Sequence, residues 1–133
     1  MSNQATAGAL GIKVLVIDDS NTIRRSAEIF LKQGGHQVLL AEDGFDALAK
    51  VNDHDPDLIF CDILMPRLDG YQTCAIIKRN AKFSGVPVIM LSSKDGLFDK
   101  ARGRMVGSED YLTNPFTKDQ LLQAVEQHRR VST

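Results

Sequence analysis

Carboxylate side chains follow two short apolar runs of the sequence, and their type favours chemistry at a metal ion. Asp18 and Asp19 follow the run Lys13–Ile17, and Asp62 follows the run Leu58–Cys61. Two carboxylates 4 Å apart repel each other by about 4 kcal/mol at an effective dielectric constant near 20. Three of them therefore persist together only where one is protonated or a cation is bound. Carboxylate oxygens with positions left for water and phosphate suit Mg²⁺. If the fold brings these acids together, they predict a magnesium site that favours phosphoryl chemistry on a carboxylate.

Hydroxyl and amide side chains follow two later apolar runs. Ser92 and Ser93 come directly after Pro87–Leu91, and the segment Thr113–Pro115 comes directly after Tyr111–Leu112. If all these runs are neighbouring parallel strands, their carboxyl ends meet at one edge of a sheet, where α/β proteins bind ligands. The acids, hydroxyls and amide are then expected to converge.

The apolar runs alternate with stretches of helical periodicity, which is the pattern of an α/β domain with a parallel sheet. Five strand–helix units predict a flavodoxin-like, doubly wound (βα)5 fold with strand order 2-1-3-4-5. In this order the first, third, fourth and fifth strands are neighbours. The predicted strands are residues 13–17, 38–41, 58–61, 87–91 and 111–112.

Capping signals mark two of the predicted helices. Asp69 with Gln72, and Thr117 with Gln120, have the spacing of capping boxes at helix starts. The fourth helix is predicted to be weak, because an interior glycine costs about 1 kcal/mol relative to alanine. The glycines that bracket or interrupt it are Gly96, Gly103 and Gly107.

Composition excludes several classes of protein. The 133 residues contain 16 Lys and Arg against 17 Asp and Glu, a net charge of −1, so no basic field favours nucleic acid. No apolar run approaches the roughly 20 residues that span a bilayer, and the N-terminus has no signal-peptide pattern. Cys61 and Cys74 lack the spacing of a disulfide or zinc framework. We expect a cytoplasmic, monomeric, single-domain protein with flexible tails at 1–12 and 131–133.

Four segments, VLVIDD, FCDILMPRLDGYQ, PVIMLSSKDG and YLTNPF, occur in this order and resemble the signatures of a two-component response regulator receiver domain. The resemblance places the domain at residues 13–130. It implies that Asp62 accepts a phosphoryl group from a CheA-like histidine kinase or a phosphotransfer domain. It also implies that Mg²⁺ is bound by Asp19, Asp62 and the backbone carbonyl of Leu64, with Asp18 acting through a metal-bound water.

The resemblance gives roles to the residues after the later strands as well. Ser92 matches the switching hydroxyl that turns toward the phosphoryl oxygens, the small Ser93 leaves room for that group, and Tyr111 matches the aromatic side chain that changes rotamer with it. Leu64 and Lys94 occupy positions that modulate autodephosphorylation in the family. Without the flanking motifs, Ser92 is equally a hydroxyl at a strand end and Tyr111 a half-buried core residue.

One position departs from the family pattern. The family carries a lysine before the proline after the fifth strand, and this chain has Asn114. Three carboxylates with Mg²⁺ and a lysine sum to zero charge, but with asparagine they sum to −1. We therefore expect weaker phosphorylation and looser coupling to the switch, unless neighbouring residues share the role. An asparagine introduced at position 114 in place of a natural lysine would give the same sequence. Receiver domains usually have a cis peptide bond here, so Pro115 is a cis-proline candidate.

The expected output is protein–protein interaction, because the chain has no DNA-binding module after the last helix. The expected docking face is the fourth helix, the fifth strand and the fifth helix. The runs DGFDALAK, PRLDGYQTC and SSKDGLFDKARGR further resemble PilG-type regulators of type IV pili and twitching motility, in a chemotaxis-like pathway.

Three alternatives stay open at this point. A pseudo-receiver that acts without phosphate is suggested by Asn114. A Mg²⁺-dependent aspartyl phosphatase also uses an aspartate at a strand end, but it requires a DxD pair and a cap insertion that this length does not hold. An FMN carrier shares the topology, but Asp18 and Asp19 would repel its phosphate. The sequence therefore favours a signalling switch over an enzyme.

Overall fold

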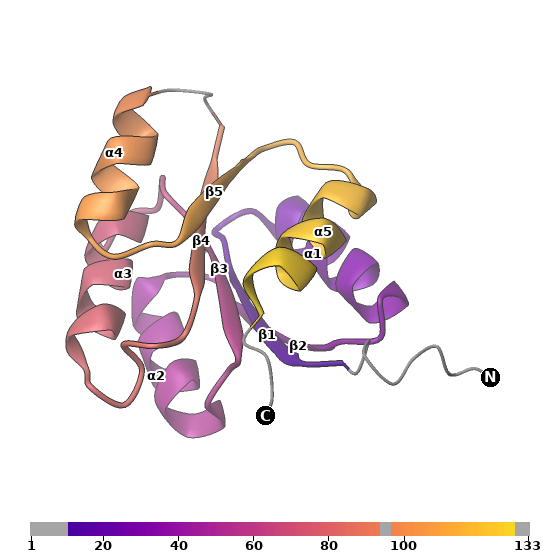
Figure 1. The fold of residues 1–133 in the computed structure, drawn as a ribbon, viewed down its shortest axis with the longest axis horizontal. Coiled ribbons are helices and arrows are strands. Elements are labelled where there is room, and N and C mark those ends of the chain that lie inside the picture. Colours follow the sequence, from indigo (N-terminus) through magenta and orange to yellow (C-terminus); the bar gives the residue numbers. More distant parts are fainter. Residues whose placement is uncertain (1–10, 94–96, 130–133) are drawn as a thin grey trace.

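The computed structural model of the protein describes residues 11–93 and 97–129, in which β-strands and α-helices alternate along the chain (Figure 1). The strands are β1 (Lys13–Ile17), β2 (Gln37–Ala41), β3 (Leu58–Asp62), β4 (Val88–Ser92) and β5 (Asp110–Thr113). The helices are α1 (Asn21–Gln33), α2 (Gly44–His54), α3 (Gly70–Arg79), α4 (Leu97–Met105) and α5 (Lys118–His128).

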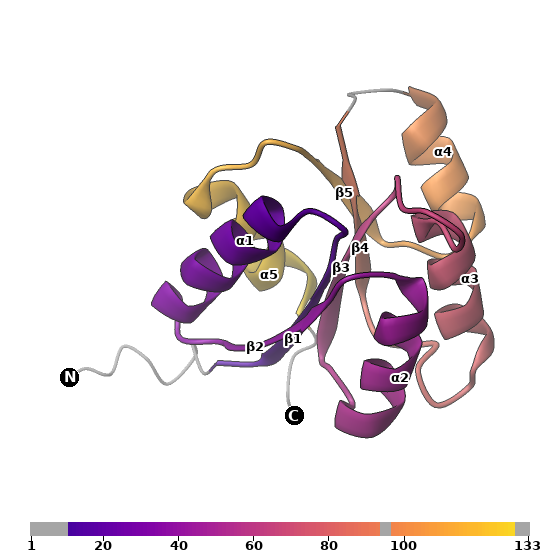
Figure 2. The same cartoon turned by 180° about the vertical axis from the view of Figure 1, so that it is seen from behind.

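The strands form one parallel sheet in the order β2-β1-β3-β4-β5, with helices on both faces. Helices α1 and α5 cover one face, and α2, α3 and α4 cover the other (Figures 1 and 2). The flavodoxin-like fold and the strand order predicted from the sequence are confirmed. The order places β3 at the centre of the sheet, with β1 and β4 on either side.

The central strands are buried because both faces of the sheet are covered. Strands β1, β3 and β4 are almost wholly inaccessible to solvent, whereas the edge strands β2 and β5 are partly exposed. Continuous apolar runs are typical of strands in this situation. Strands β3 and β4 extend one residue beyond the prediction, to Asp62 and Ser92, and β4 begins after Pro87, which has no N–H to donate.

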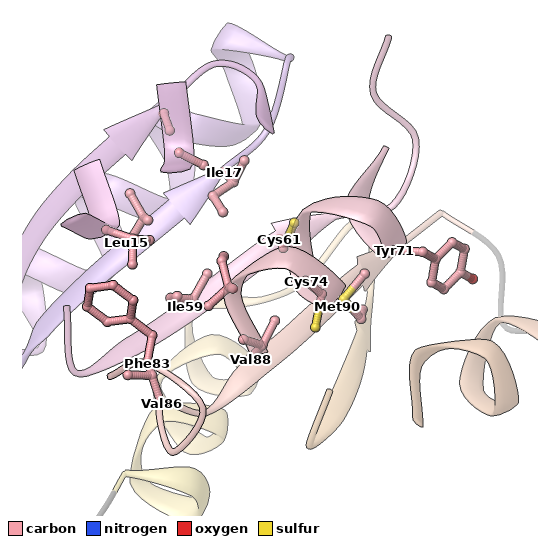
Figure 3. Packing of buried hydrophobic residues seen from close by; sticks show 14 of the residues in the cluster. Leu15, Ile17, Ile59, Cys61, Tyr71, Cys74, Phe83, Val86, Val88 and Met90 are labelled. Carbon is pink, nitrogen blue, oxygen red and sulfur yellow. The ribbon is translucent and has the colours of Figure 1, made fainter. Parts of the chain in front are cut away.

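Two apolar clusters hold the helices against the sheet. One joins the sheet to α2 and α3, and the other joins it to α1 and α5. The first contains both cysteines, Cys61 and Cys74, each fully shielded from solvent (Figure 3). Burial raises the pKa of both thiols, that of Cys74 to about 11. The cysteines are therefore packing residues in this fold.

The helix starts follow the capping signals. Asp69 and Thr117 form the two predicted capping boxes. At α1 the cap is Ser20, whose side chain accepts from the N–H of Ile23. Neither Asp18 nor Asp19 is therefore the cap of this helix, and both acids need another explanation.

The ends of the folded unit differ slightly from the predicted ranges. Ile12, which the prediction places in the tail, packs against the second cluster, and its N–H donates to Nδ1 of His36 at 3.1 Å. Residues 1–10 and 131–133, as well as Lys94 and Gly96, lie outside the described residues. In residues 11–93 and 97–129, no helix is long and apolar enough to cross a membrane.

Candidate functional site

Three carboxylates converge at the carboxyl edge of the sheet. Asp18 follows β1, and Asp62 is the last residue of the neighbouring strand β3, where Ile17 pairs with Cys61. One oxygen from each of Asp18, Asp19 and Asp62 can be chosen so that all three lie within 4.8 Å of one another. The convergence predicted from the strand order is therefore present.

Asp18 is the most buried of the three acids, with 2% of its surface exposed. Its Oδ1 accepts from the backbone N–H of Ser20 at 2.9 Å, and its carbonyl oxygen accepts from the guanidinium of Arg24. Its other carboxylate oxygen, Oδ2, is buried and has no hydrogen-bond partner among the described residues. Burial raises the pKa of Asp18, the Ser20 N–H opposes this, and the charge of Asp19 adds to it.

Asp62 has the most strongly perturbed carboxyl group at this edge. Its pKa is raised from 3.8 to about 8, first by burial, then by the charge of Asp18 and by a hydrogen bond with Asp19. The backbone N–H of Leu64, 3.3 Å from Asp62 Oδ1, opposes the shift. A carboxyl group in this environment either keeps its proton near neutral pH or requires a cation beside it.

The residues at this edge fit a magnesium ion. The donors are hard carboxylate oxygens, which Mg²⁺ prefers over nitrogen or sulfur ligands. The unpartnered Oδ2 of Asp18 would find a partner in a metal-bound water. Leu64 lies beside the cluster, since its N–H reaches Asp62, while its side chain is 67% exposed. The ligand roles of these residues remain predictions.

Gly70 positions Asp62 through the backbone, and the sequence analysis missed it. Its N–H donates to the carbonyl of Ile63 at 2.9 Å. A Cβ atom at Gly70 would lie 2.2 Å from the carbonyl oxygen of Asp62, far inside van der Waals contact. Only glycine lets the start of α3 approach the end of β3 this closely. In the sequence, Asp69–Gly70 indicates only the start of a helix, because the contact of Gly70 with the end of β3 is tertiary.

Ser92 ends β4 beside Asp62, since Leu91 pairs with Asp62 in the sheet. Its hydroxyl donates to Asp99 Oδ2 in the first turn of α4, at 2.8 Å. The other oxygen of this carboxylate, Oδ1, accepts from the hydroxyl of Tyr71 in α3 at 3.2 Å. Ser92 is buried and Ser93 is exposed. Asp99 was also missed, because nothing in the sequence of α4 distinguishes it from an ordinary surface acid.

Tyr111 lies in β5, two strands from Asp62. It is partly buried against the first apolar cluster, and Nζ of Lys100 lies 4.7 Å from its ring centroid. This environment matches the alternative interpretation of Tyr111 as a half-buried core residue. Its role as a switch remains a prediction.

Asn114 follows β5 at the same edge of the sheet. Its backbone N–H donates to the carbonyl of Ser92 at 2.6 Å. Its side-chain oxygen is buried and lacks a hydrogen-bond partner within the described part of the chain. The Asn114–Pro115 peptide bond is cis, the conformation predicted for Pro115.

Comparison with known proteins places this geometry in context. The model of the response regulator receiver domain family matches residues 14–126. Protein PilG of Pseudomonas aeruginosa is 66% identical over 118 residues, which cover 89% of this chain and 87% of that protein. Protein PilH of the same organism is 38% identical over 113 residues, covering 85% of this chain and 93% of the relative.

Solved structures agree with the family match. The chemotaxis protein CheY4 of Vibrio cholerae superposes with a TM-score of 0.86 at 30% identity, covering 89% of this chain and 98% of that one. A putative response regulator from Chloroflexus aurantiacus gives a TM-score of 0.85 at 30% identity, covering 88% and 96% of the two chains.

Proposed function

Because this chain belongs to the family of response regulator receiver domains, we propose that Asp62 accepts a phosphoryl group from a phosphohistidine of a kinase or phosphotransfer domain. The observation that carries the proposal is the cluster of Asp18, Asp19 and Asp62 at the end of the central strand. A structural role does not explain three acids at one sheet edge, because their mutual repulsion costs stability unless a cation or proton is bound.

The transfer requires an ionised Asp62. One carboxylate oxygen attacks the phosphorus atom, a P–O bond forms, and the P–N bond to the histidine ring breaks with its electron pair returning to the ring nitrogen. Asp62 keeps its proton up to a pKa of about 8 in the chain alone, so bringing positive charge to the cluster favours the reactive form. Positioning and electrostatics account for most of the catalysis in such transfers.

The residues that would hold Mg²⁺ are Asp19, Asp62 and the carbonyl of Leu64, with Asp18 binding a water of the ion through Oδ2. When bound, Mg²⁺ supplies positive charge against the acids and the phosphoryl oxygens. Asp18 is fixed for this role by the N–H of Ser20.

The output of the switch follows from Ser92, Ser93 and Tyr111. The hydroxyl of Ser92 turns toward the phosphoryl group, for which Ser93 leaves room, and Tyr111 changes rotamer with it. The affected face is α4, β5 and α5, where a partner protein binds. The uncharged Asn114 stabilises the phosphoryl group on Asp62 less than a lysine would.

The biological setting of the switch is control of type IV pili and twitching motility. Support for this comes from the 66% identity with PilG over most of both chains. The kinase is CheA-like, the receiver unit spans residues 13–130, and the chain acts as a monomer in the cytoplasm, the compartment where such kinases hold their phosphohistidine.

The test is phosphorylation with a small donor. We expect incubation with acetyl phosphate and Mg²⁺ to add the mass of one phosphoryl group to the chain, measured by intact-protein mass spectrometry. Asp62→Ala should abolish the gain. The exposed Asp53 in α2 provides a matched control, and Asp53→Ala should be labelled like the wild type. Labelling of Asp62→Ala to the same extent would refute the proposal.

Asn114 favours a second candidate, a pseudo-receiver that works without phosphate. Its side-chain oxygen, which has no hydrogen-bond partner among the described residues, lies where the family carries a positive charge. No labelling of the wild type, with binding of the output partner retained, would establish this alternative. Steady turnover of a phosphate ester would instead indicate an aspartyl phosphatase.

A further inference from the structure

A groove of about 380 Å³ lies between α3 and α4, on the opposite side of α4 from β5. We call it the α3–α4 groove, and it is separate from the α4, β5 and α5 face. The lining residues that matter here are Leu68, Tyr71, Ile76, Arg79, Arg102 and Val106. The lining of the groove thus combines apolar side chains with two positively charged arginines.

The apolar part of the groove includes a side chain that the fold leaves uncovered. Ile76 is 39% exposed, whereas its neighbour Ile77 is 2% exposed and packs into the core. Leu68 and Val106 are only partly buried beside it. An isoleucine that is exposed between two partly buried apolar residues gains free energy when a partner covers it.

The charged part of the groove has one sign. Arg79 and Arg102 are both exposed, and no carboxylate is among the described residues that line the groove. Arg79 makes no ion pair within the described part of the chain, and Arg102 lies with Cζ 4.5 Å from the ring centroid of Tyr71. The whole chain carries −1, so a preference for an acidic partner has to arise locally.

From this arrangement we infer that the α3–α4 groove binds an acidic amphipathic segment of a partner protein, with apolar side chains on Ile76 and carboxylates on Arg79 and Arg102. Arginine pairs with carboxylates in a bidentate geometry that lysine does not offer. Apolar and aromatic side chains together with arginine are enriched in protein–protein contacts.

One wall of the groove is connected to the proposed switch. The ring of Tyr71, which belongs to the first apolar cluster, extends toward α4 (Figure 3), and its hydroxyl donates to Asp99 Oδ1 at 3.2 Å. The other oxygen of Asp99 accepts from the hydroxyl of Ser92 at 2.8 Å. When Ser92 turns toward a phosphoryl group, Asp99 loses this hydrogen bond. The positions of Tyr71 and Arg102 beside the groove are then no longer fixed through Asp99 and Ser92.

The connection sets the direction of coupling between the two sites. A segment that fits the groove in its present form binds the unphosphorylated chain more tightly, because ligands stabilise the state they fit. By linkage, the bound segment also disfavours phosphorylation of Asp62. This part of the inference rests on the proposed function, whereas binding in the groove does not.

The probe for the experiment is a fluorescein-labelled peptide of about 18 residues, long enough to form a helix, with leucines at helical spacing and glutamates and alanines elsewhere. A second peptide carries lysine in place of every glutamate. We expect the acidic peptide to bind the full chain, measured by fluorescence anisotropy, and to shift amide NMR signals of α3 and α4. The lysine peptide should not bind. Absence of binding up to about 1 mM, or shifts on another face, would overturn the inference.

Matched variants separate the groove from general surface effects. Ile76→Asp and Arg79→Glu should each weaken binding at least about fivefold. The controls are Ile29→Asp and Arg25→Glu on α1, where Ile29 is 46% exposed and Arg25 is also exposed. These controls should bind like the wild type. Equal losses of peptide affinity in the groove variants and in the control variants would show that the peptide does not bind in the groove.

The coupling is measured on chain treated with acetyl phosphate and Mg²⁺. We expect phosphorylated chain to bind the peptide about fivefold more weakly, and Tyr71→Phe to abolish this difference. If mass spectrometry shows no phosphoryl group on Asp62, the proposed function fails. Binding of the peptide to the untreated chain then still tests whether the α3–α4 groove is a binding site. Equal affinity of fully phosphorylated and untreated chain would overturn the coupling.

Discussion

The hydroxyl of Ser92 donates to a carboxylate oxygen of Asp99 at 2.8 Å, which joins the end of β4 to the first turn of α4. Ser92 is the side chain proposed to turn toward the phosphoryl group. In the unphosphorylated chain it is therefore held by a different acid from the one that accepts phosphate. Its movement has to break this bond.

The first prediction concerns the strength of the hydrogen bond between Ser92 and Asp99. A hydrogen bond to a charged acceptor contributes about 1.5–3 kcal/mol, and part of this is recovered when Ser92 binds elsewhere. We expect Asp99→Ala to speed labelling of Asp62 by acetyl phosphate about three- to tenfold. Asp119→Ala, which removes an exposed acid from the first turn of α5, should leave the rate unchanged. A rate for Asp99→Ala at or below that of the wild type would contradict the prediction.

The second prediction concerns pH. The pKa of Asp62 is raised from 3.8 to about 8, so between these values the folded chain holds a proton that the unfolded chain has released. The free energy of unfolding therefore falls as the pH rises through this range. In metal-free buffer, Asp62→Asn should be more stable than the wild type above about pH 8. Solvent contact screens the effect, so we expect a gain of about 2 kcal/mol rather than the full value of the shift.

The difference should be small near pH 3, where the Asp62 carboxyl group is largely protonated in both the folded and the unfolded chain. Urea unfolding at the two pH values measures it. Asp53→Asn, at an exposed position of α2, should show no such pH-dependent gain. An equal effect of Asp62→Asn at both pH values would contradict the raised pKa.

The third prediction concerns the metal. Free Mg²⁺ at about ten times its dissociation constant should stabilise the wild type by about 1.4 kcal/mol, since it binds only the folded chain. For a domain of this length this corresponds to a rise of about 4 °C in melting temperature. Asp19→Asn should lose the rise, and EDTA should abolish both the rise and the labelling of Asp62. NaCl at matched ionic strength is the control. A similar rise with NaCl would show that screening alone is responsible.

The fourth prediction concerns Asn114. Lysine at this position adds the positive charge that the cluster lacks, and it removes a buried amide oxygen that has no hydrogen-bond partner among the described residues. We expect Asn114→Lys to accelerate labelling by acetyl phosphate about tenfold, because one well-placed charge is worth about 1–2 kcal/mol. Asn52→Lys, on the exposed face of α2, makes the same change of net charge and should have no effect. Equal rates for Asn114→Lys and the wild type would remove the motive for the pseudo-receiver alternative.

The fifth prediction separates two glycines. A Cβ at Gly70 meets backbone atoms of β3, which cannot move aside, so Gly70→Ala should destabilise the fold by about 3 kcal/mol. A Cβ at Gly103 in α4 meets mainly the hydroxyl of Ser108 at 2.8 Å, which can rotate. The helix propensity of alanine offsets this, so Gly103→Ala should stay within about 1 kcal/mol of the wild type. Equal losses in urea unfolding would contradict the close approach at Gly70.

The fold and the acidic cluster were predictable because both depend on local patterns. Apolar runs such as Lys13–Ile17 give buried strands, and the strand order then fixes which strand ends are neighbours. Asp18, Asp19 and Asp62 follow these runs directly, so their convergence required no knowledge of side-chain packing. The two capping boxes were predictable for the same reason, since each involves residues within one turn.

The parts of the site that the sequence did not reveal depend on how elements pack. Whether Asp99 faces Ser92 is decided by the rotation of α4 about its own axis, and the short helix, interrupted by Gly103, lacks a clear periodicity that would indicate it. Gly70 matters because α3 begins against β3, a tertiary contact without a sequence signature. The α3–α4 groove likewise exists only between two packed helices.

The burial of Cys61 and Cys74 makes the chain convenient for site-directed labelling. Both thiols are shielded from solvent, and their raised pKa keeps them protonated and unreactive at neutral pH. A maleimide dye should therefore react selectively with a single cysteine introduced at the surface, without removal of the native pair. Ile76→Cys would report on the α3–α4 groove, and Ile29→Cys on α1 would serve as the reference position.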